Sequence, residues 1–260
     1  MSRMLAVLDT ATAPARGDPE LAQLTQDFIA LSVLHADGWG VASRHQNRTE
    51  VRVGTDPAER GMGSVLASPA SARLLYLRFA SAGSAVKKRN LQPFVTDDVA
   101  FAHNGLLAPR SLMLATLSFD QRHDLRGDTD SEVYFAHVLR ALLTRRRSRP
   151  AADTIAPIVA ELRALYPEAC LNALMLVSGE LLAIHAPGTV GPPLAAFAAR
   201  GAKALPPGHD ADYNVLSTAV LPSGRRVVAT SGIDVIDSHP LPRDAVSAFL
   251  PNGLTRSIAI

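Results

Sequence analysis

The 260-residue sequence predicts an α+β fold in which strands and helices form layers within a single domain, residues 1–260. Short apolar segments typical of buried strands come first, and segments with helical periodicity follow them. The last part of the chain returns to apolar segments joined by tight turns, the pattern of antiparallel hairpins. This order favours a layered α+β protein over one built from alternating parallel units.

The first half of the chain supplies most of the predicted strands. Residues 4–8 are continuously apolar and predict a buried strand. An amphipathic helix is expected where apolar residues recur at helical spacing, at Leu21, Leu24, Phe28 and Leu31. A glycine-bearing turn at 35–40 leads into a strand at 41–42, and alternating Val51 and Val53 predict its hairpin partner. Two further strands are predicted at 74–78 and 99–103, each ending at polar residues.

The second half begins with two predicted helices. In GDTDSEVYFAHVLRALL, Thr129 and Glu132 have the spacing of a capping box. The apolar face of this helix consists of Phe135, Ala136, Leu139, Leu142 and Leu143, and the face of the next helix of Ile155, Val159 and Leu162. LNALMLVSGELLAIHA then predicts two strands around a Ser-Gly-Glu turn, and segments 215–220 and 227–230 repeat this pattern across Pro-Ser-Gly. The Pro/Gly-rich stretch 187–207 predicts a loop.

Composition and charge narrow the class of protein. Apolar residues make up 47% and charged residues 19%, as in soluble globular proteins. The net charge of +2 gives no reason to expect nucleic acid, and the basic run Arg145, Arg146, Arg147 and Arg149 stands where cations complement a helix dipole. A secretory signal and an apolar run of about 20 residues are both missing. The single cysteine, Cys170, excludes an internal disulfide and suggests a reducing compartment. Taken together, these features predict a cytoplasmic protein that binds neither nucleic acid nor membrane.

Polar residues and glycines gather where apolar segments end, which is where binding sites are usually built. They form four motifs: DGWG with Asp37, LRFASAG with Arg78 and Ser81, FAHNG with His103, Asn104 and Gly105, and GDTDSE with Asp128 and Asp130. Each has an ordinary structural explanation, such as an Asn-Gly turn or an acidic first turn of a helix. Together they offer a guanidinium for a carboxylate, a carboxylate for an ammonium and amide donors for an oxyanion. This set suits a free α-amino acid but lacks a nucleophile and a base.

A metal site built from His123, Asp128, Asp130 and His137 is the weaker alternative. Only Asp130 and His137 share a predicted helix, and they lie two turns apart, too far to bind one ion without other ligands. We therefore expect no metal and no cofactor.

The order of the motifs resembles the class II glutamine amidotransferases, whose nucleophile is the amino-terminal residue. The resemblance rests on MSRMLAVLD, HADGWGVA, LRFASAG, NLQPF, VAFAHNGLL and GDTDSEV, and covers roughly residues 1–145. It is closest to the stand-alone branch that includes the γ-glutamyl hydrolase of ergothioneine biosynthesis. It implies the four-layer αββα sandwich of amino-terminal-nucleophile hydrolases, with two stacked antiparallel sheets between helical layers.

The resemblance also implies roles for individual residues. Arg78 would grip the α-carboxylate of glutamine beside Ser81, and Asp130 would bind the α-ammonium, with His103 in the same substrate-binding set. Asn104 and Gly105 would form the oxyanion hole. Ser2 would be the nucleophile once Met1 is removed, with its own α-amine as the base, a group whose unperturbed pKa is about 8.

The family has cysteine where this chain has Ser2. A thiol is more acidic and intrinsically more nucleophilic than a serine hydroxyl, which relies entirely on its base. Three explanations stay open: a substitution made to trap a bound substrate, a natural but slow nucleophile, or a site that lost catalysis and kept binding. Cys170 offers no replacement and is expected in the core. Gln92 also departs from the family, parts of which have histidine there.

Two functions follow from the sequence. The first is an enzyme that hydrolyses the side-chain amide of glutamine, or of another γ-glutamyl small molecule, through a γ-glutamyl-enzyme intermediate. Any released ammonia would then pass to a separate synthase subunit, and without such a subunit the substrate would be a γ-glutamyl conjugate. The alternative is a catalytically inactive glutamine-binding or scaffold subunit of a partner enzyme. The sequence leaves room for a homo-oligomer in either case.

Overall fold

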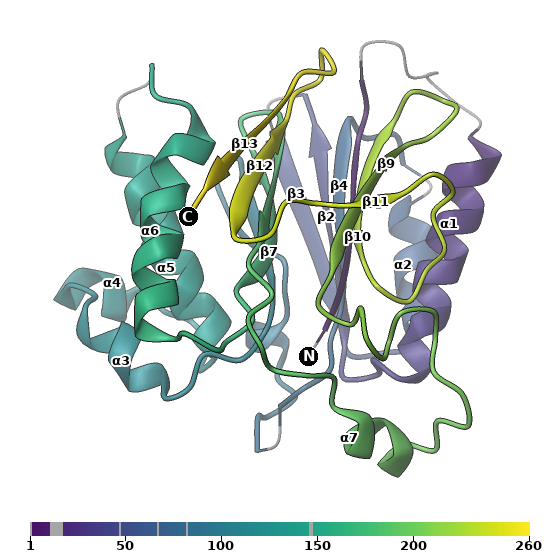
Figure 1. Ribbon diagram of the computed structural model, residues 1–260, viewed down its shortest axis with the longest axis horizontal. Coiled ribbons are helices and arrows are strands. Elements are labelled where there is room, and N and C mark those ends of the chain that lie inside the picture. Colours follow the sequence, from purple (N-terminus) through teal and green to yellow (C-terminus); the bar gives the residue numbers. More distant parts are fainter. Residues whose placement is uncertain (1, 11–17, 47, 67, 82, 146–147) are drawn as a thin grey trace.

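The structure is a computed structural model that describes residues 2–10, 18–46, 48–66, 68–81, 83–145 and 148–260. Met1 and two arginines of the basic run, Arg146 and Arg147, therefore lie outside the described residues. The described residues form two antiparallel sheets that stack face to face, with helices on both outer faces (Figure 1). This arrangement confirms the predicted αββα sandwich.

The first sheet has seven strands in the described residues, in the order β11-β9-β10-β1-β4-β2-β3. Their bounds are β1 (Arg3–Leu8), β2 (Trp39–His45), β3 (Arg48–Gly54), β4 (Ala72–Leu77), β9 (Leu216–Val220), β10 (Arg226–Thr230) and β11 (His239–Pro240). The second sheet has six described strands, in the order β13-β12-β8-β7-β6-β5. Their bounds are β5 (Phe94–Thr96), β6 (Val99–Asn104), β7 (Asn172–Val177), β8 (Glu180–His185), β12 (Ala245–Phe249) and β13 (Thr255–Ala259).

Helices cover the two outer faces, as Figure 1 shows with α1 and α2 on one side and α5 and α6 on the other. The bounds are α1 (Pro19–Ala30), α2 (Ala58–Leu66), α3 (Arg110–Ala115), α4 (Phe119–His123), α5 (Asp130–Thr144), α6 (Ala151–Leu165) and α7 (Leu194–Ala199), with 3₁₀ turns η1 (Leu31–Val33) and η2 (Lys88–Asn90). Within the described ranges, none of these helices is long and apolar enough to cross a membrane.

The core is divided into layers by the two sheets. Met4 and Leu74 point between the sheets, where they meet Leu174 of the second sheet. Leu5, the next residue of β1, packs on the outer face in the cluster that contains Phe28 of α1. Both faces of β1 are thus covered, which explains why its sequence is continuously apolar instead of alternating.

Most of the predicted elements are present, with informative differences at their ends. The Thr129 side chain caps α5 by accepting the Glu132 N–H at 3.3 Å, as expected. The Glu132 carboxylate does not return to the cap residue, because it accepts the N–H groups of Arg126 and Gly127 at 2.7 and 2.8 Å. It therefore closes the preceding loop onto the helix start.

Two expectations need correction. The stretch 187–207, predicted as a loop, contains the short helix α7, whose sequence LAAFAA is rich in alanine and whose Phe197 is fully buried. The first predicted helix ends at Ala30, and Leu31 belongs to the following 3₁₀ turn. Leu31 is nevertheless buried against the same core, so the apolar periodicity continued past the end of the α-helical backbone.

Candidate active site

The start of β1 is fixed by a buried arginine. Arg3 has no exposed surface, and its Nε donates to the Ser2 carbonyl at 2.6 Å. Its Nη1 donates to the Tyr213 carbonyl at 3.0 Å and to Ser231 Oγ at 2.7 Å, while the guanidinium stacks 3.9 Å from the centroid of the Tyr213 ring. These contacts hold the main chain of Ser2 in place, and sequence reasoning assigned Arg3 no role.

The hydroxyl of Ser2 belongs to a hydrogen-bonded path between the two sheets. Ser2 Oγ lies 2.7 Å from the Tyr76 hydroxyl and accepts the Phe79 N–H at 3.3 Å. Gln92 Nε2 donates to the same Tyr76 hydroxyl at 3.1 Å, and Gln92 Oε1 accepts the His103 N–H at 2.6 Å. The path connects Ser2, directly before β1 of the first sheet, with His103 near the end of β6 in the second. Tyr76 was missed from the sequence because it reads as one apolar residue in a buried strand.

Asn104 closes β6 and carries an unpaired amide. The residue is fully buried, and among the described residues neither its Oδ1 nor its Nδ2 has a hydrogen-bond partner. The adjacent Gly105 passes so close to the Cys170 carbonyl that an added Cβ would lie only 1.8 Å from that oxygen. Glycine is therefore required where the backbone leaves the strand.

The turn formed by Asn104 and Gly105 is held by His103 and Cys170. His103 Nε2 lies 3.0 Å from the Cys170 carbonyl, so this nitrogen carries the ring hydrogen, and Nδ1 accepts from Ser131 Oγ at 2.9 Å. The Cys170 thiol donates to the Asn104 carbonyl at 3.0 Å. Burial raises the pKa of Cys170 to about 11, so the group stays a thiol. Cys170 is buried, as predicted for a core residue, and both ring nitrogens of His103 are engaged by the protein.

The predicted recognition residues lie around these segments. Arg78 directly follows β4 and is 4% exposed; its Nη1 donates to the Ala85 carbonyl at 3.1 Å and its Nη2 to Ser84 Oγ at 2.9 Å. Ser81 lies in the same loop, where its carbonyl accepts the Ser84 N–H. Asp130, the first residue of α5, accepts the Leu107 N–H at 2.6 Å and so contacts the segment after Gly105.

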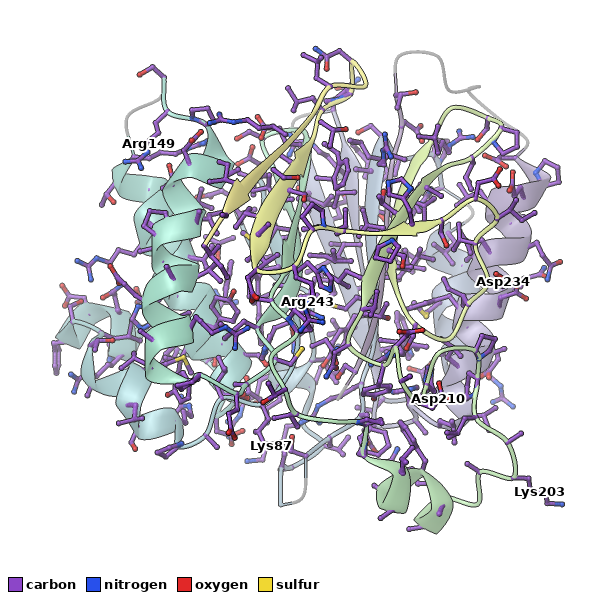
Figure 2. The ribbon with its side chains drawn as sticks, viewed as in Figure 1. Lys87, Arg149, Lys203, Asp210, Asp234 and Arg243 are labelled. Atoms are coloured by element: carbon purple, nitrogen blue, oxygen red, sulfur yellow. The ribbon has the colours of Figure 1, made fainter. Side chains whose placement is uncertain are left out.

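Asp128 ties a second loop to the start of α5. Its carboxylate lies 3.0 Å from Lys87 Nζ, and hydrogen bonds from Lys87 and then Asn90 hold its pKa below the usual value (Figure 2 labels Lys87). Of the two histidines of the metal alternative, His137 approaches the Met113 carbonyl at 3.2 Å and His123 stacks on the Phe119 ring. In the part of the chain that the structure describes, no group of three or more His, Cys, Asp or Glu side chains is placed to hold a metal ion.

Phe79 belongs to a cluster of five packed aromatic rings. Its members are His35, Phe79, Phe197, His209 and Tyr213, whose rings meet at centroid distances from 5.2 to 5.9 Å. Arg200, at the end of α7, stacks 4.0 Å from the Phe79 ring centroid and pairs with Asp37 at 2.5 Å. Asp37 in turn accepts the Ala80 N–H at 2.7 Å. Asp37 of the DGWG motif therefore fixes the segment that supplies the Phe79 N–H to Ser2.

Comparison with solved structures agrees with this fold. A glutamine aminotransferase class-II domain protein from Silicibacter pomeroyi is 16% identical with a TM-score of 0.61, and the match covers 99% of this chain and 98% of that one. The glutamine phosphoribosylpyrophosphate amidotransferase of B. subtilis is 14% identical with a TM-score of 0.63, over 99% of this chain but 49% of that chain. A predicted glutamine amidotransferase from Pseudomonas aeruginosa is 16% identical with a TM-score of 0.53, over 99% of this chain and 100% of that chain. At these identities the likeness shows the fold alone.

Sequence comparison is more specific. No curated protein sequence matches this chain significantly. The family model of the class II glutamine amidotransferases matches residues 23–206, a range that contains Arg78, Asn104 and Asp130 and begins after Ser2. Because this match covers most of the chain, the protein belongs to the class II glutamine amidotransferases.

Proposed function

We propose that this chain hydrolyses the side-chain amide of glutamine, or of a γ-glutamyl amide, with Ser2 as the nucleophile. The observation that carries the proposal is the fully buried amide of Asn104, which has no hydrogen-bond partner among the described residues. Leaving a buried polar group unpaired costs about 1–3 kcal/mol, so such groups in folded proteins call for an explanation. An oxyanion that forms only during reaction would be the missing partner, and the Gly105 N–H would be the second donor.

The surrounding residues support recognition of an amino acid. Arg78 is buried and carries five N–H donors, of which the loop contacts to Ala85 and Ser84 use two. A bound α-carboxylate would share the guanidinium with that loop. The Asp130 carboxylate has one oxygen engaged by the Leu107 N–H, and its other oxygen would accept from the α-ammonium.

The reaction would proceed in two stages. Removal of Met1 would free the Ser2 α-amine, which takes the hydroxyl proton while Oγ attacks the amide carbon. The charge on the former carbonyl oxygen would be stabilised by Asn104 and Gly105. The C–N bond then breaks as the α-ammonium donates its proton to the leaving nitrogen. Water, deprotonated by the same amine, attacks the γ-glutamyl ester and releases glutamate and free Ser2.

The identity of the leaving amine determines whether a separate synthase subunit is needed. If glutamine is the substrate, ammonia is released and a separate synthase subunit would use it. If the substrate is a γ-glutamyl conjugate, as in the stand-alone branch, the amine itself is the product and such a subunit is not needed. Glutamate release from glutamine and from a panel of γ-glutamyl amides distinguishes the two.

The test compares the unchanged chain with Ser2→Ala and Ser2→Cys. We expect glutamate release by the unchanged chain, loss in Ser2→Ala and an increase in Ser2→Cys, because a thiol is the better nucleophile. Glutamine binding without turnover in both Ser2 and Ser2→Cys chains would overturn the proposal and favour a glutamine-binding subunit.

A further inference from the structure

We infer, on the basis of the proposed function, that the Tyr76 hydroxyl is a catalytic hydrogen-bond donor to Ser2 Oγ and that Gln92 sets the direction of this bond. The geometry points to a donor matched to serine, one that assists departure of Oγ when the γ-glutamyl ester is hydrolysed. Tyr76, Ser2 and Gln92 form one continuous path, with 2.7 and 3.1 Å between successive polar atoms.

The orientation of the Gln92 amide is fixed by the main chain of His103, whose N–H can only donate and whose carbonyl can only accept. The His103 N–H donates to Oε1 at 2.6 Å, while Nε2 faces the His103 carbonyl at 3.4 Å. Exchanging the two ends of the amide would bring N–H against N–H and oxygen against oxygen. Gln92 Nε2 must therefore donate to the Tyr76 hydroxyl, and Tyr76 must accept that hydrogen.

The hydrogen of the Tyr76 hydroxyl has one destination in the described part of the chain. The residue is 2% exposed, and the hydroxyl has two partners there, Gln92 and Ser2. Gln92 uses its nitrogen as a donor, so Ser2 Oγ is the acceptor that remains. Burial raises the pKa of Tyr76 to about 12, which keeps the hydroxyl protonated at neutral pH.

The hydrogen-bonding capacity of Ser2 Oγ follows from these directions. A hydroxyl oxygen accepts two hydrogen bonds and donates one. Tyr76 and the Phe79 N–H fill both acceptor positions. The hydrogen of Ser2 is left for a base, which in the proposed reaction is the α-amine of the same residue.

The donor matters most when Oγ carries negative charge. During attack, the Oγ–H proton passes to the α-amine and charge develops on Oγ before the new C–O bond is complete. During ester hydrolysis, that C–O bond breaks and the electron pair returns to Oγ until the α-ammonium restores the proton. A thiolate leaves readily because a thiol has a pKa of about 8.5, whereas a serine alkoxide needs stabilisation. Tyr76 keeps its own proton throughout.

The experiment is a double-mutant cycle with Tyr76→Phe in the Ser2 and the Ser2→Cys chains. With a γ-glutamyl anilide as substrate, we expect Tyr76→Phe to lower kcat about 10- to 100-fold in the Ser2 chain, the loss expected for one hydrogen bond to a charged atom. In the Ser2→Cys chain the same change should alter kcat little. Tyr166→Phe is the matched control, since that buried hydroxyl also accepts one hydrogen bond, from the Met113 N–H, and donates another, to the Pro109 carbonyl.

Gln92→Glu tests the positioning role separately. The carboxylate would accept from both the His103 N–H and the Tyr76 hydroxyl, which draws the Tyr76 hydrogen away from Ser2. We expect kcat to fall as in Tyr76→Phe with KM unchanged, and a melting curve verifies that the variant folds. An unchanged kcat in the folded variant would overturn the role of Gln92.

The outcomes separate this inference from the proposed function. Equal losses in the Ser2 and Ser2→Cys chains, or no loss in the Ser2 chain, would overturn the role of Tyr76 while glutaminase activity stands. Turnover by the Ser2→Cys chain alone would show that Ser2 is not a working nucleophile and would remove the role of Tyr76 with it. Failure of both chains on every amide overturns the proposed function itself.

Discussion

Asn104 and Asn172 face each other across strands β6 and β7, and only one of them has its amide satisfied. Both are fully buried. Asn172 Oδ1 accepts the Ala186 N–H at 2.9 Å and its Nδ2 donates to the Asn214 carbonyl at 2.6 Å, whereas neither polar side-chain atom of Asn104 has a partner in the described residues. The same side chain at paired positions thus has a structural use in one strand and is left free in the other.

This difference makes opposite predictions for two alanine variants. Asn104→Ala should lower kcat about 10²- to 10³-fold, the loss seen when an oxyanion donor is removed. Its free energy of unfolding should fall by less than about 1 kcal/mol, because no side-chain hydrogen bond is broken and the cost of burying an unpaired amide is removed. Asn172→Ala should cost about 2–4 kcal/mol by leaving the Ala186 N–H and the Asn214 carbonyl unpaired, with kcat of the folded protein retained. Urea unfolding and initial rates measure both, and a large loss of stability in Asn104→Ala would contradict its free amide.

Arg78 should act on substrate binding. Arg78→Lys removes the planar pair of donors that a carboxylate accepts, so we expect KM for glutamine to rise about 10-fold or more. Arg73→Lys, in the strand β4 that ends just before Arg78, is the matched control, because Arg73 donates to the carbonyls of Leu66 and Ser68. An equal rise in KM for both variants would mean that Arg78 has no special place in recognition.

Gly105 should tolerate no side chain. The Cβ of Gly105→Ala would meet the Cys170 carbonyl carbon and oxygen, which are backbone atoms and cannot swing away. We expect a lower melting temperature and loss of activity. Gly63→Ala, in helix α2 with no atom near its Cβ position, should instead gain about 0.5–1 kcal/mol from helix propensity. A stable and active Gly105→Ala variant would refute the close approach.

The buried histidine pair predicts an acid-sensitive fold. His35 Nε2 and His209 Nε2 lie 3.2 Å apart, and the charged side chains that act on them include Arg3, Arg200 and Asp210. Burial, followed by the charge of Arg3, lowers the pKa of His209 from 6.5 to about 3 and that of His35 well below its usual value. Below pH 6.5 the two histidines therefore stay neutral in the folded state, while the same residues gain protons in the unfolded chain.

The sign follows from these depressed values. The contribution of His209 to the free energy of unfolding is fully present above pH 6.5 and is lost as the pH falls toward about 3. The part already lost at pH 5 is about 2 kcal/mol. Urea unfolding at pH 7 and pH 5 should show a smaller loss of stability for His209→Asn than for the unchanged chain. Identical losses would mean that His209 does not titrate with a depressed pKa.

The fold was largely predictable because its signals are local. The continuous apolar run of β1 and the Thr129 cap of α5 follow from neighbouring residues, and both elements are present. Helix α7 was missed because its six residues are flanked by prolines and glycines, which dominate any short window. What makes it helical is the burial of Phe197 against His35 and Phe79, contacts that no local pattern reveals.

The site was predictable only where a motif carries it. Asn104 and Gly105 belong to a motif that ends a predicted strand, and Asp130 to one that begins a predicted helix. Arg3 and Tyr76 instead lie in apolar strands with no distinguishing neighbour. Their importance comes from pairing across the sheet and between sheets, as when Gln92 bridges Tyr76 to His103. Such bridges depend on how the two sheets stack, which no local sequence pattern reveals. Whether Ser2 and the recognition residues act as proposed stays a prediction.

The most direct measurement is the intact mass of the protein, acid-quenched while glutamine is being consumed, with peptide mapping of any adduct and parallel assay of Ser2→Ala. The account predicts glutamate release and one γ-glutamyl group on the amino-terminal peptide containing Ser2, both lost in Ser2→Ala. Glutamate release that survives in Ser2→Ala, or glutamine binding with neither release nor adduct, would contradict it.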